Sequence, residues 1–282
     1  MGSMVQLFEV IDHILETPSF KPISTGFEAL DRMDVRLERG KLYVIGGRPG
    51  MGKTSLMLDI ALHAAGEENI PVHIFTLAES SEQLALRVLA RYGEKPIHKT
   101  EKDESAHRQA FETNREELES IPLYFYDSAF AFSDIEETIY GKKLSGLIFI
   151  DDLQLVDVGI GKYSTSNNIR CKNPDLKRQK ELAILLETIA QKANVPIVVL
   201  SQVSRNMERR KDKRPVLGDN RYSDLIEQRA DAVIFIYRDA YYNPDNAQKP
   251  EPAELIVAKN RRGSTGTAFV VFDDGRLSFQ GG

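Results

Sequence analysis

The 282-residue sequence lacks several features that would each indicate a different class of protein. It contains one cysteine, Cys171, so it can form no intrachain disulfide, and nothing in it resembles a zinc site. No apolar run approaches the roughly 20 residues that cross a bilayer. The N-terminus also lacks the basic-then-apolar pattern of a secretory signal. These absences predict a cytoplasmic protein with no membrane partner.

An excess of positive charge is missing as well, because the formal net charge is −5. A basic surface for duplex DNA is therefore not expected, and any contact with nucleic acid must be local. One local candidate is the segment 205–214, which holds six cations and two anions. Taken alone, such a run fits a solvated loop as well as it fits a nucleic-acid contact.

Alternating apolar strands and amphipathic helices indicate the fold class. The chain is long enough for one large α/β domain or two small ones. We expect strands at 41–45, 71–77, 121–125, 147–151, 195–202, 232–237, 253–259 and 268–272. Helices are expected at 55–62, 81–92, 134–140 and 176–193, with further helical spacing at 101–119. This order predicts an α/β fold with a mostly parallel, twisted sheet and helices on both faces.

The N-terminal region is expected to stand apart from this core. Residues 1–3 have the composition of a cloning remnant, which suggests a fragment of a longer protein. Residues 4–17 have the spacing of an amphipathic helix, which could pack on a neighbouring subunit or on its own domain. We therefore divide the chain into 1–3, a linker helix and connection at 4–22, and a core domain at 23–282.

The most informative motif is a phosphate-binding P-loop. Residues 47–54 read Gly-Arg-Pro-Gly-Met-Gly-Lys-Thr, between an apolar strand and a helix. Glycines in such a loop let consecutive backbone N–H groups face a phosphate, and the helix N-terminus adds partial positive charge. The motif predicts binding of ATP or ADP with Mg²⁺, through Arg48, Pro49, Gly50, Met51, Gly52, Lys53, Thr54 and Ser55.

Two later strands end in polar residues that would reach the same edge of the sheet. Asp151 ends the apolar run 147–151 in the manner of a Walker B element, so it would hold the magnesium ion together with Thr54. A helix-capping role is the alternative for Asp151. Gln202 ends another strand and could sense the γ-phosphate, although a plain polar strand end is almost as compatible with the spacing.

Six motifs in order resemble one family. They lie at 23–31, 48–54, 147–155, 200–205, 226–239 and 258–267, and together they span nearly the whole chain. The sequence resembles the C-terminal ATPase domain of replicative hexameric helicases of the DnaB type, within the RecA-like superfamily. The resemblance implies a hexameric ring with ATP between subunits, single-stranded DNA in its channel and 5′→3′ movement.

The resemblance also implies residue roles and partners. The family's Lys-x-Arg hairpin, which reaches the next subunit's nucleotide, corresponds here to Lys259 and Arg261. An arginine fork supplied in this way stabilises charge on a transferring phosphoryl group. The family's linker helix resembles residues 4–17. Primase and a helicase loader are implied as partners of the full-length protein.

The sequence departs from the family pattern at the catalytic base. The position that usually holds the catalytic glutamate is Ala78, and the next residue is Glu79. Glu79 could act as the base through a one-residue shift, or the change could be engineered to trap nucleotide, or hydrolysis could be naturally weak. Without a base, turnover should fall by roughly two to four orders of magnitude.

The candidate DNA contacts depart from the pattern too. Family members commonly carry Arg-Glu-Ser-Gly where this chain has 221–224, Arg-Tyr-Ser-Asp. We predict that a backbone-tracking channel includes Arg205, Arg209, Arg210, Lys213 and Arg221. A ring-forming helicase motor is the favoured function. A recombination ATPase of the RecA/RadA type and a weakly hydrolysing, nucleotide-gated scaffold are the alternatives.

Overall fold

The computed structural model describes Leu7 and residues 21–93, 104–128, 131–159, 174–219, 224–244 and 249–281. Within these residues, the strands are β1 Leu42–Gly47, β2 Val72–Thr76, β3 Leu123–Tyr126, β4 Leu147–Asp151, β5 Ile197–Gln202, β6 Ala232–Arg238, β7 Glu251–Asn260, β8 Gly266–Asp273 and β9 Ser278–Gly281. The predicted helix at 4–17 lies outside the described residues apart from Leu7.

The α-helices of the described residues are α2 Glu28–Asp31, α3 Lys53–Leu62, α4 Ser81–Tyr92, α5 Glu104–Thr113, α6 Arg115–Ser120, α7 Phe132–Gly141, α8 Pro174–Ala193, α9 Asp224–Arg229 and α10 Asp239–Tyr242. A π-helical turn, η1 His63–Glu67, continues α3, and short 3-10 turns occur at η2 Leu153–Leu155 and η3 Arg205–Arg209. The helical spacing predicted over 101–119 therefore resolves into two helices, α5 and α6.

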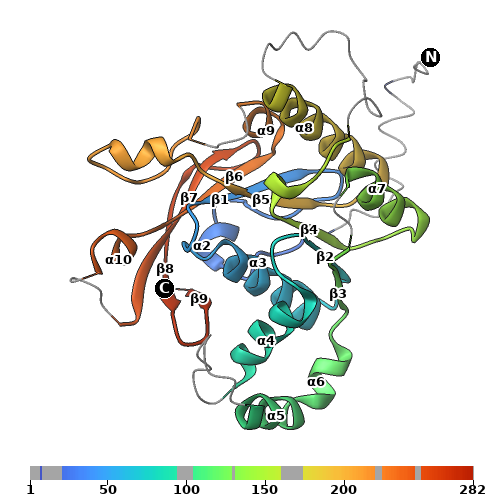
Figure 1. The fold of residues 1–282 in the computed structure, drawn as a ribbon, viewed down its shortest axis with the longest axis vertical. Coiled ribbons are helices and arrows are strands. Elements are labelled where there is room, and N and C mark those ends of the chain that lie inside the picture. The colour runs from blue at the N-terminus through green and yellow to red at the C-terminus, as the bar shows by residue number, and fades with distance from the viewer. Residues whose placement is uncertain are drawn as a thin grey trace.

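All nine strands form one sheet in the order β3-β2-β4-β5-β1-β6-β7-β8-β9 (Figure 1). The strands from β3 to β6 are parallel, and β7 to β9 continue the sheet in antiparallel fashion. The predicted α/β class with a mostly parallel sheet is confirmed. The antiparallel extension was not predicted as such, and the short strand β9 was missed.

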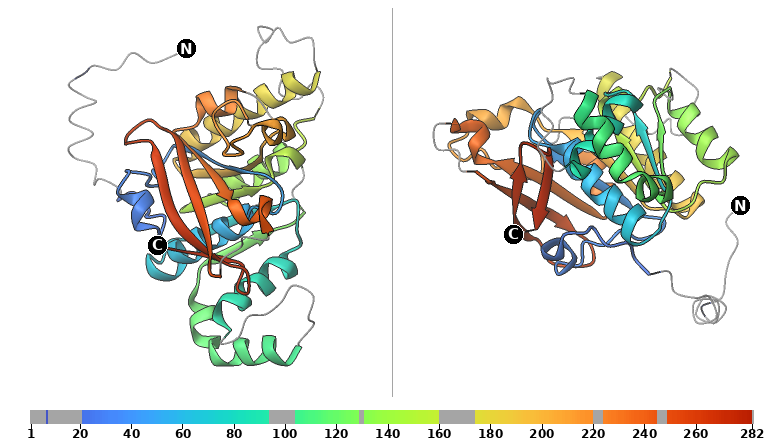
Figure 2. Two further views of the ribbon diagram at one scale, coloured as in Figure 1. Left: turned by 90° about the vertical axis from the view of Figure 1, so that its left-hand side faces the viewer. Right: turned by 90° about the horizontal axis from the view of Figure 1, so that it is seen from below.

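Helices cover both faces of the parallel part, which explains its continuous apolar strands. Successive side chains of a strand point to opposite faces, and those of β1 enter two different cores. Tyr43 and Ile45 pack in the core that includes α3 and α4. Leu42 and Val44 pack in the core that includes α7, α8 and α9. Figure 2 shows the two layers of helices from other sides, with α5 and α6 beyond α4 at the far end of the molecule.

The side chains of Ser80 and Gln83 set where helix α4 begins after β2. Ser80 precedes α4, its side chain accepts a hydrogen bond from the Gln83 N–H at 3.3 Å, and the Gln83 side chain accepts from the Ser80 N–H at 3.0 Å. This reciprocal capping box satisfies two donors that the first helical turn would leave unpaired. It ends the β2–α4 connection close to the sheet edge where the parallel strands finish.

Candidate active site

The P-loop connects β1 to α3 and has the backbone geometry that its glycines allow. Gly50 and Gly52 adopt φ angles of +81° and +97°, in the left-handed region. A side chain at Gly52 would lie 2.9 Å from the ring of Phe279 on β9. The missed strand β9 therefore closes the space beside the start of α3. Both features hold the loop in a shape that presents its amides at a helix N-terminus.

The Walker A and Walker B residues meet at the carboxyl edge of the sheet. The Thr54 hydroxyl donates a hydrogen bond to Asp151 Oδ2 at 2.8 Å. The Lys53 ammonium donates to the Gly47 carbonyl at 3.3 Å. Burial lowers the pKa of Lys53, and the nearby charges of Asp152 and Asp151 oppose this larger effect. The sequence predicted this meeting of Lys53, Thr54 and Asp151.

Burial dominates the electrostatics of this edge. Asp151 is only 2% exposed, and burial raises the pKa of its carboxyl to about 6, while the Thr54 hydrogen bond acts in the opposite direction. Burial likewise lowers the pKa of Lys53. The burial of Asp151 keeps most water from its carboxyl, and low exposure to water strengthens charge–charge interactions.

The donor set fits a magnesium ion. Mg²⁺ prefers hard oxygen ligands and is commonly held by one or two protein oxygens together with substrate phosphates. The Thr54 hydroxyl and the Asp151 carboxylate are two such oxygens, already side by side at the end of the P-loop. No cluster of three or more histidine, cysteine or acidic side chains suitable for a metal occurs among the described residues.

Gln202 and Glu79 lie at the same sheet edge. Gln202 is the register partner of Gly47, where the P-loop begins. Glu79 follows β2, whose last residue pairs with Asp151, and its charge contributes to the raised pKa of that carboxyl. The Glu79 carboxylate is engaged with the Arg87 guanidinium at 2.6 Å. Ala78, where the resemblance predicted a glutamate, is exposed.

Two arginine side chains next to the P-loop form ion pairs that the sequence did not predict. The buried Arg48 side chain pairs with Glu208 at 2.7 Å and donates to the Val203 carbonyl at 3.1 Å. Arg238 pairs with both oxygens of Glu251 at 2.7 Å and donates to the Gly50 carbonyl at 3.1 Å. The one feature of the sequence that could have pointed to Arg238 is its place as a cation at the end of the apolar strand β6.

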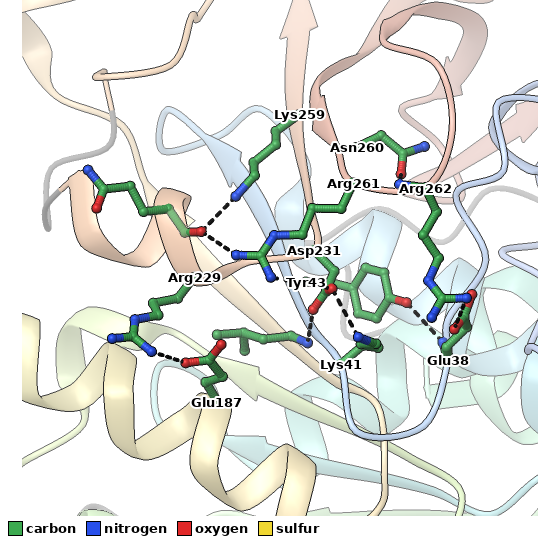
Figure 3. A network of polar contacts seen from close by, with 12 residues as sticks. Glu38, Lys41, Tyr43, Glu187, Arg229, Asp231, Lys259, Asn260, Arg261 and Arg262 are labelled. Atoms are coloured by element: carbon green, nitrogen blue, oxygen red, sulfur yellow. Dashed lines mark hydrogen bonds and ion pairs between the residues drawn. The ribbon is translucent and has the colours of Figure 1, made fainter. Parts of the chain in front are cut away.

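Lys259 and Arg261 lie on the hairpin side of the sheet and bind the C-terminal end of α9 (Figure 3). The Lys259 ammonium donates to the carbonyl oxygens of Glu227 and Gln228, both at 2.7 Å. Arg261 also donates to the Gln228 carbonyl at 2.7 Å and lies 3.8 Å from Asp231. Burial and the neighbouring Arg261 lower the pKa of Lys259. These cations occupy the negative end of a helix.

The hairpin cations and the P-loop lie at opposite ends of β1. The Arg261 N–H donates to the Asp231 carbonyl, and the Asp231 N–H donates to the Leu42 carbonyl. Leu42 begins β1, whereas Gly47 ends it. Five residues of strand span about 17 Å. Arg261 is therefore too far from its own P-loop for its side chain to reach a phosphate bound there.

The residues predicted to contact DNA fall into three groups. Arg205 and Arg209 are exposed on η3, and their side chains make no ion pair with any described residue. Arg210 instead pairs with Asp219 at 2.5 Å, and Lys213 lies over the Tyr242 ring at 4.7 Å. Arg221 lies outside the described residues.

Comparison with known proteins shows the family. The model of the DnaB-like helicase C terminal domain matches residues 22–281, nearly the whole chain. The chain belongs to this DnaB-like family. It is 36% identical over 260 residues to a replicative DNA helicase DnaB of Geobacillus stearothermophilus, which covers 89% of this chain and 54% of that protein. A probable replicative DNA helicase of Trieres chinensis is 33% identical over 290 residues, covering 98% of this chain and 62% of that protein.

Solved structures agree with the family. The ATPase domain of G40P is similar to the DnaB-like domain with a TM-score of 0.78 and 26% identity, covering 98% of this chain and 96% of that one. A DnaB-like replicative helicase studied with primase has a TM-score of 0.82 and 26% identity, covering 98% and 67%. A KaiC-like protein of Pyrococcus horikoshii OT3, at 16% identity and a TM-score of 0.58, shares the fold alone. The RecA-like fold is confirmed.

The DnaB-like domain spans between about half and two thirds of the length of the curated relatives it matches. Among the residues that the structure describes, no helix is both long and apolar enough to cross a membrane.

The first family motif, at 23–31, forms a closed turn in which Asp31 accepts hydrogen bonds from Ser24 and Thr25 side chains at 2.5 and 2.8 Å. This motif therefore shapes the entry into the fold and contributes no group to the P-loop.

Proposed function

We propose that the DnaB-like domain is the ATPase motor of a ring-shaped replicative DNA helicase, coupling ATP hydrolysis to 5′→3′ movement along single-stranded DNA. The observation that carries the proposal is the assembled Walker A and Walker B pair, with Thr54 donating to Asp151 at 2.8 Å beside the Lys53 ammonium. Family membership, through relatives named replicative DNA helicases, supports the same function.

Each residue at the P-loop edge then has a role in binding or orienting Mg–ATP. The backbone N–H groups of Arg48 and of residues 50–55 hold the phosphates, Pro49 shapes the loop without donating, and Lys53 places a cation at the β- and γ-phosphates. Thr54 and Asp151 hold Mg²⁺, which when bound neutralises charge on the transferring phosphoryl group. Gln202 senses the γ-phosphate. Glu79 orients the attacking water and accepts its proton, after its carboxylate leaves Arg87.

The position of the hairpin cations supports a ring. Lys259 and Arg261 lie near the start of β1, about 17 Å of strand from where the P-loop begins, so they can stabilise a phosphoryl group only on another copy of the chain. An arginine supplied in trans commonly accelerates phosphoryl transfer by several orders of magnitude. We propose a homo-hexamer in which each hairpin completes the neighbour's site.

The DNA track in this proposal consists of Arg205, Arg209, Lys213 and Arg221, with Arg210 at its base. Exposed cations on a short helix can follow a phosphate backbone without reading sequence. The Arg210–Asp219 pair supports a bracing role for Arg210 within the same segment. In the full-length protein, residues 4–22 are the proposed linker, residues 23–282 the proposed ATPase domain, and primase and a helicase loader the proposed partners.

A weakly hydrolysing scaffold is the second candidate, because one observation favours it. Ala78 occupies the usual glutamate position, and the neighbouring Glu79 carboxylate is held by Arg87 at 2.6 Å. A ring with this arrangement would bind ATP and DNA and yet turn over slowly. No feature of the described residues favours a recombination ATPase over these two.

The test is ATP turnover by the chain with and without oligo-dT, together with unwinding of a forked duplex. The motor predicts turnover that rises at least about tenfold with oligo-dT, and unwinding that depends on ATP. Lys53→Ala should remove both activities because the β- and γ-phosphates lose their cation, whereas Lys192→Ala, an exposed lysine of α8, should keep them. Nucleotide binding without DNA stimulation would select the scaffold.

A further inference from the structure

Arg48, the second residue of the P-loop, turns its side chain away from the phosphate cradle. Its side chain is 8% exposed, and its guanidinium lies against the segment that follows β5. Nε donates to Glu208 Oε1 at 2.7 Å and Nη1 donates to the Val203 carbonyl at 3.1 Å. A planar guanidinium held by two acceptors has a fixed direction, so a movement of the Arg48 backbone is transmitted to both partners.

Glu208 lies within the candidate DNA track. It belongs to η3 Arg205–Arg209, between the exposed Arg205 and the exposed Arg209. Met207, directly before it, is 1% exposed and anchors η3 in the core. A displacement of Glu208 around this anchor would therefore reorient the two cations that flank it.

The rest of the segment is tied to other elements. Arg210 and the Ser204 N–H bind Asp219, and Arg214 pairs with Glu254 of β7 at 2.5 Å. Within the part of the chain that the structure describes, Arg48–Glu208 is the one ion pair that joins the P-loop to η3. The two proposed ligands, a triphosphate and a DNA backbone, thus lie on either side of a single charged contact.

We propose that the Arg48–Glu208 pair couples the nucleotide site to the DNA track, so that occupancy of the P-loop sets the positions of Arg205 and Arg209. Arg48 and Glu208 are positioning residues in this inference, and neither needs to touch DNA. The inference rests on the proposed function and deepens it, because it names the contact through which nucleotide and DNA affect each other's binding.

The experiment measures binding linkage, which does not require hydrolysis. The Kd of fluorescein-labelled oligo-dT is determined for the whole chain in Mg²⁺ buffer, with and without a non-hydrolysable ATP analogue, and the ratio of the two values is the coupling factor. Linkage requires that the same factor be found for the analogue's Kd with and without oligo-dT. We expect a factor of about 10 or more for the unaltered chain.

Glu208→Gln tests the pair, because it removes the charge and keeps the size of the side chain. We expect its coupling factor to fall to within about twofold of one, whatever the Kd of each ligand measured alone. Glu208→Asp keeps the charge and should recover part of the factor. The matched control is Glu254→Gln, which breaks the Arg214 pair of the same segment without touching the P-loop.

The outcomes separate the inference from the proposed function. A Glu208→Gln factor equal to that of the unaltered chain overturns the inference, and so does an equal loss in Glu254→Gln. An unaltered chain that binds both ligands without linkage overturns it as well. A chain that binds neither ATP nor oligo-dT removes the proposed function, and the inference with it. Unfolding temperatures of all variants show whether a lost factor reflects general destabilisation.

Discussion

The two ends of β1 carry charged clusters that are built in different ways. At the carboxyl end, Asp151 is buried, and Lys53 beside it is partly buried with a pKa that desolvation lowers. At the amino end, Lys259 and Arg261 bind carbonyl oxygens of α9, and the Arg261 side chain, 44% exposed, also lies 3.8 Å from the Asp231 carboxylate. The first cluster is complete within one chain. The second consists of cations whose present partners are weaker than a phosphate would be.

The difference teaches how one chain can serve two sites. Buried groups hold a fixed geometry, which suits the binding of a nucleotide in the chain's own P-loop. The half-exposed Arg261 now has one carbonyl hydrogen bond and a carboxylate at 3.8 Å, and a doubly charged phosphate would be a stronger partner, because charge-assisted hydrogen bonds are about twice as strong as neutral ones. The amino end of β1 is thus suited to acting on another molecule.

The strongest way to break this comparison is Arg261→Ala. We expect ATP turnover to fall about 10³-fold, because the neighbour's phosphoryl group loses its arginine, while ATP affinity of the isolated chain stays unchanged. Steady-state turnover and calorimetric ATP binding measure the two. The control is Arg262→Ala, which removes a neighbouring arginine that pairs with Glu38 at 2.8 Å. A loss of ATP affinity in monomeric Arg261→Ala would show that the residue acts within its own chain.

A second test concerns the buried end, through pH. The Asp151 pKa of about 6 lies above the roughly 3.9 of an unfolded aspartate. The folded chain therefore binds more protons than the unfolded chain between these two pKa values. The contribution of protonated Asp151 to the free energy of unfolding is greatest below about pH 4, and it is lost as the pH rises through about 6. In nucleotide-free, magnesium-free buffer, the free energy of unfolding relative to Asp151→Asn should fall by up to about 3 kcal/mol over this range.

Urea unfolding of the two proteins at a series of pH values measures this difference. Asp151→Asn is the appropriate reference because Asp59 and Asp152, whose pKa values burial also raises, titrate in both proteins. Parallel pH profiles for the two proteins would show that the Asp151 carboxyl is solvated, and the contrast between the two ends of β1 would then disappear.

The third test sharpens the comparison at the catalytic base. Glu79→Gln should lower single-turnover ATP hydrolysis by about 100-fold, because a neutral amide cannot accept the proton of the attacking water. Glu82→Gln, on the neighbouring α4, is the control. Unchanged hydrolysis in Glu79→Gln would assign no base function to Glu79. In that case Ala78→Glu, which restores the family residue, should raise turnover.

The sequence predicted the P-loop edge because its signals are local. The glycine spacing and the apolar strand before Asp151 each lie within a few residues, and the parallel strands bring their ends together. The antiparallel course of β7 to β9 was missed, since strand direction depends on pairing between distant segments. Phe279, which packs beside Gly52, became visible only with β9 in place.

The ion-pair partners of individual side chains also could not be predicted from the sequence. Arg48 and Glu208 are separated by 160 residues, and a P-loop arginine suggests a phosphate contact before it suggests an ion pair elsewhere. The net charge of segment 205–214 likewise gave no sign that Arg210 and Arg214 are neutralised by Asp219 and Glu254. Charge counts describe a segment's composition, whereas the cations available to a ligand depend on its folded neighbours.

The continuous sheet has a consequence for any ring built from this chain. β1 and β7 are separated only by β6, and both are joined to it by a hydrogen-bonded register. The spacing between a protomer's own P-loop and its own hairpin is therefore set by a stiff lattice of strands. In the proposed hexamer, the gap at each seam would open or close by tilting of whole protomers, so the seams would not change independently of one another.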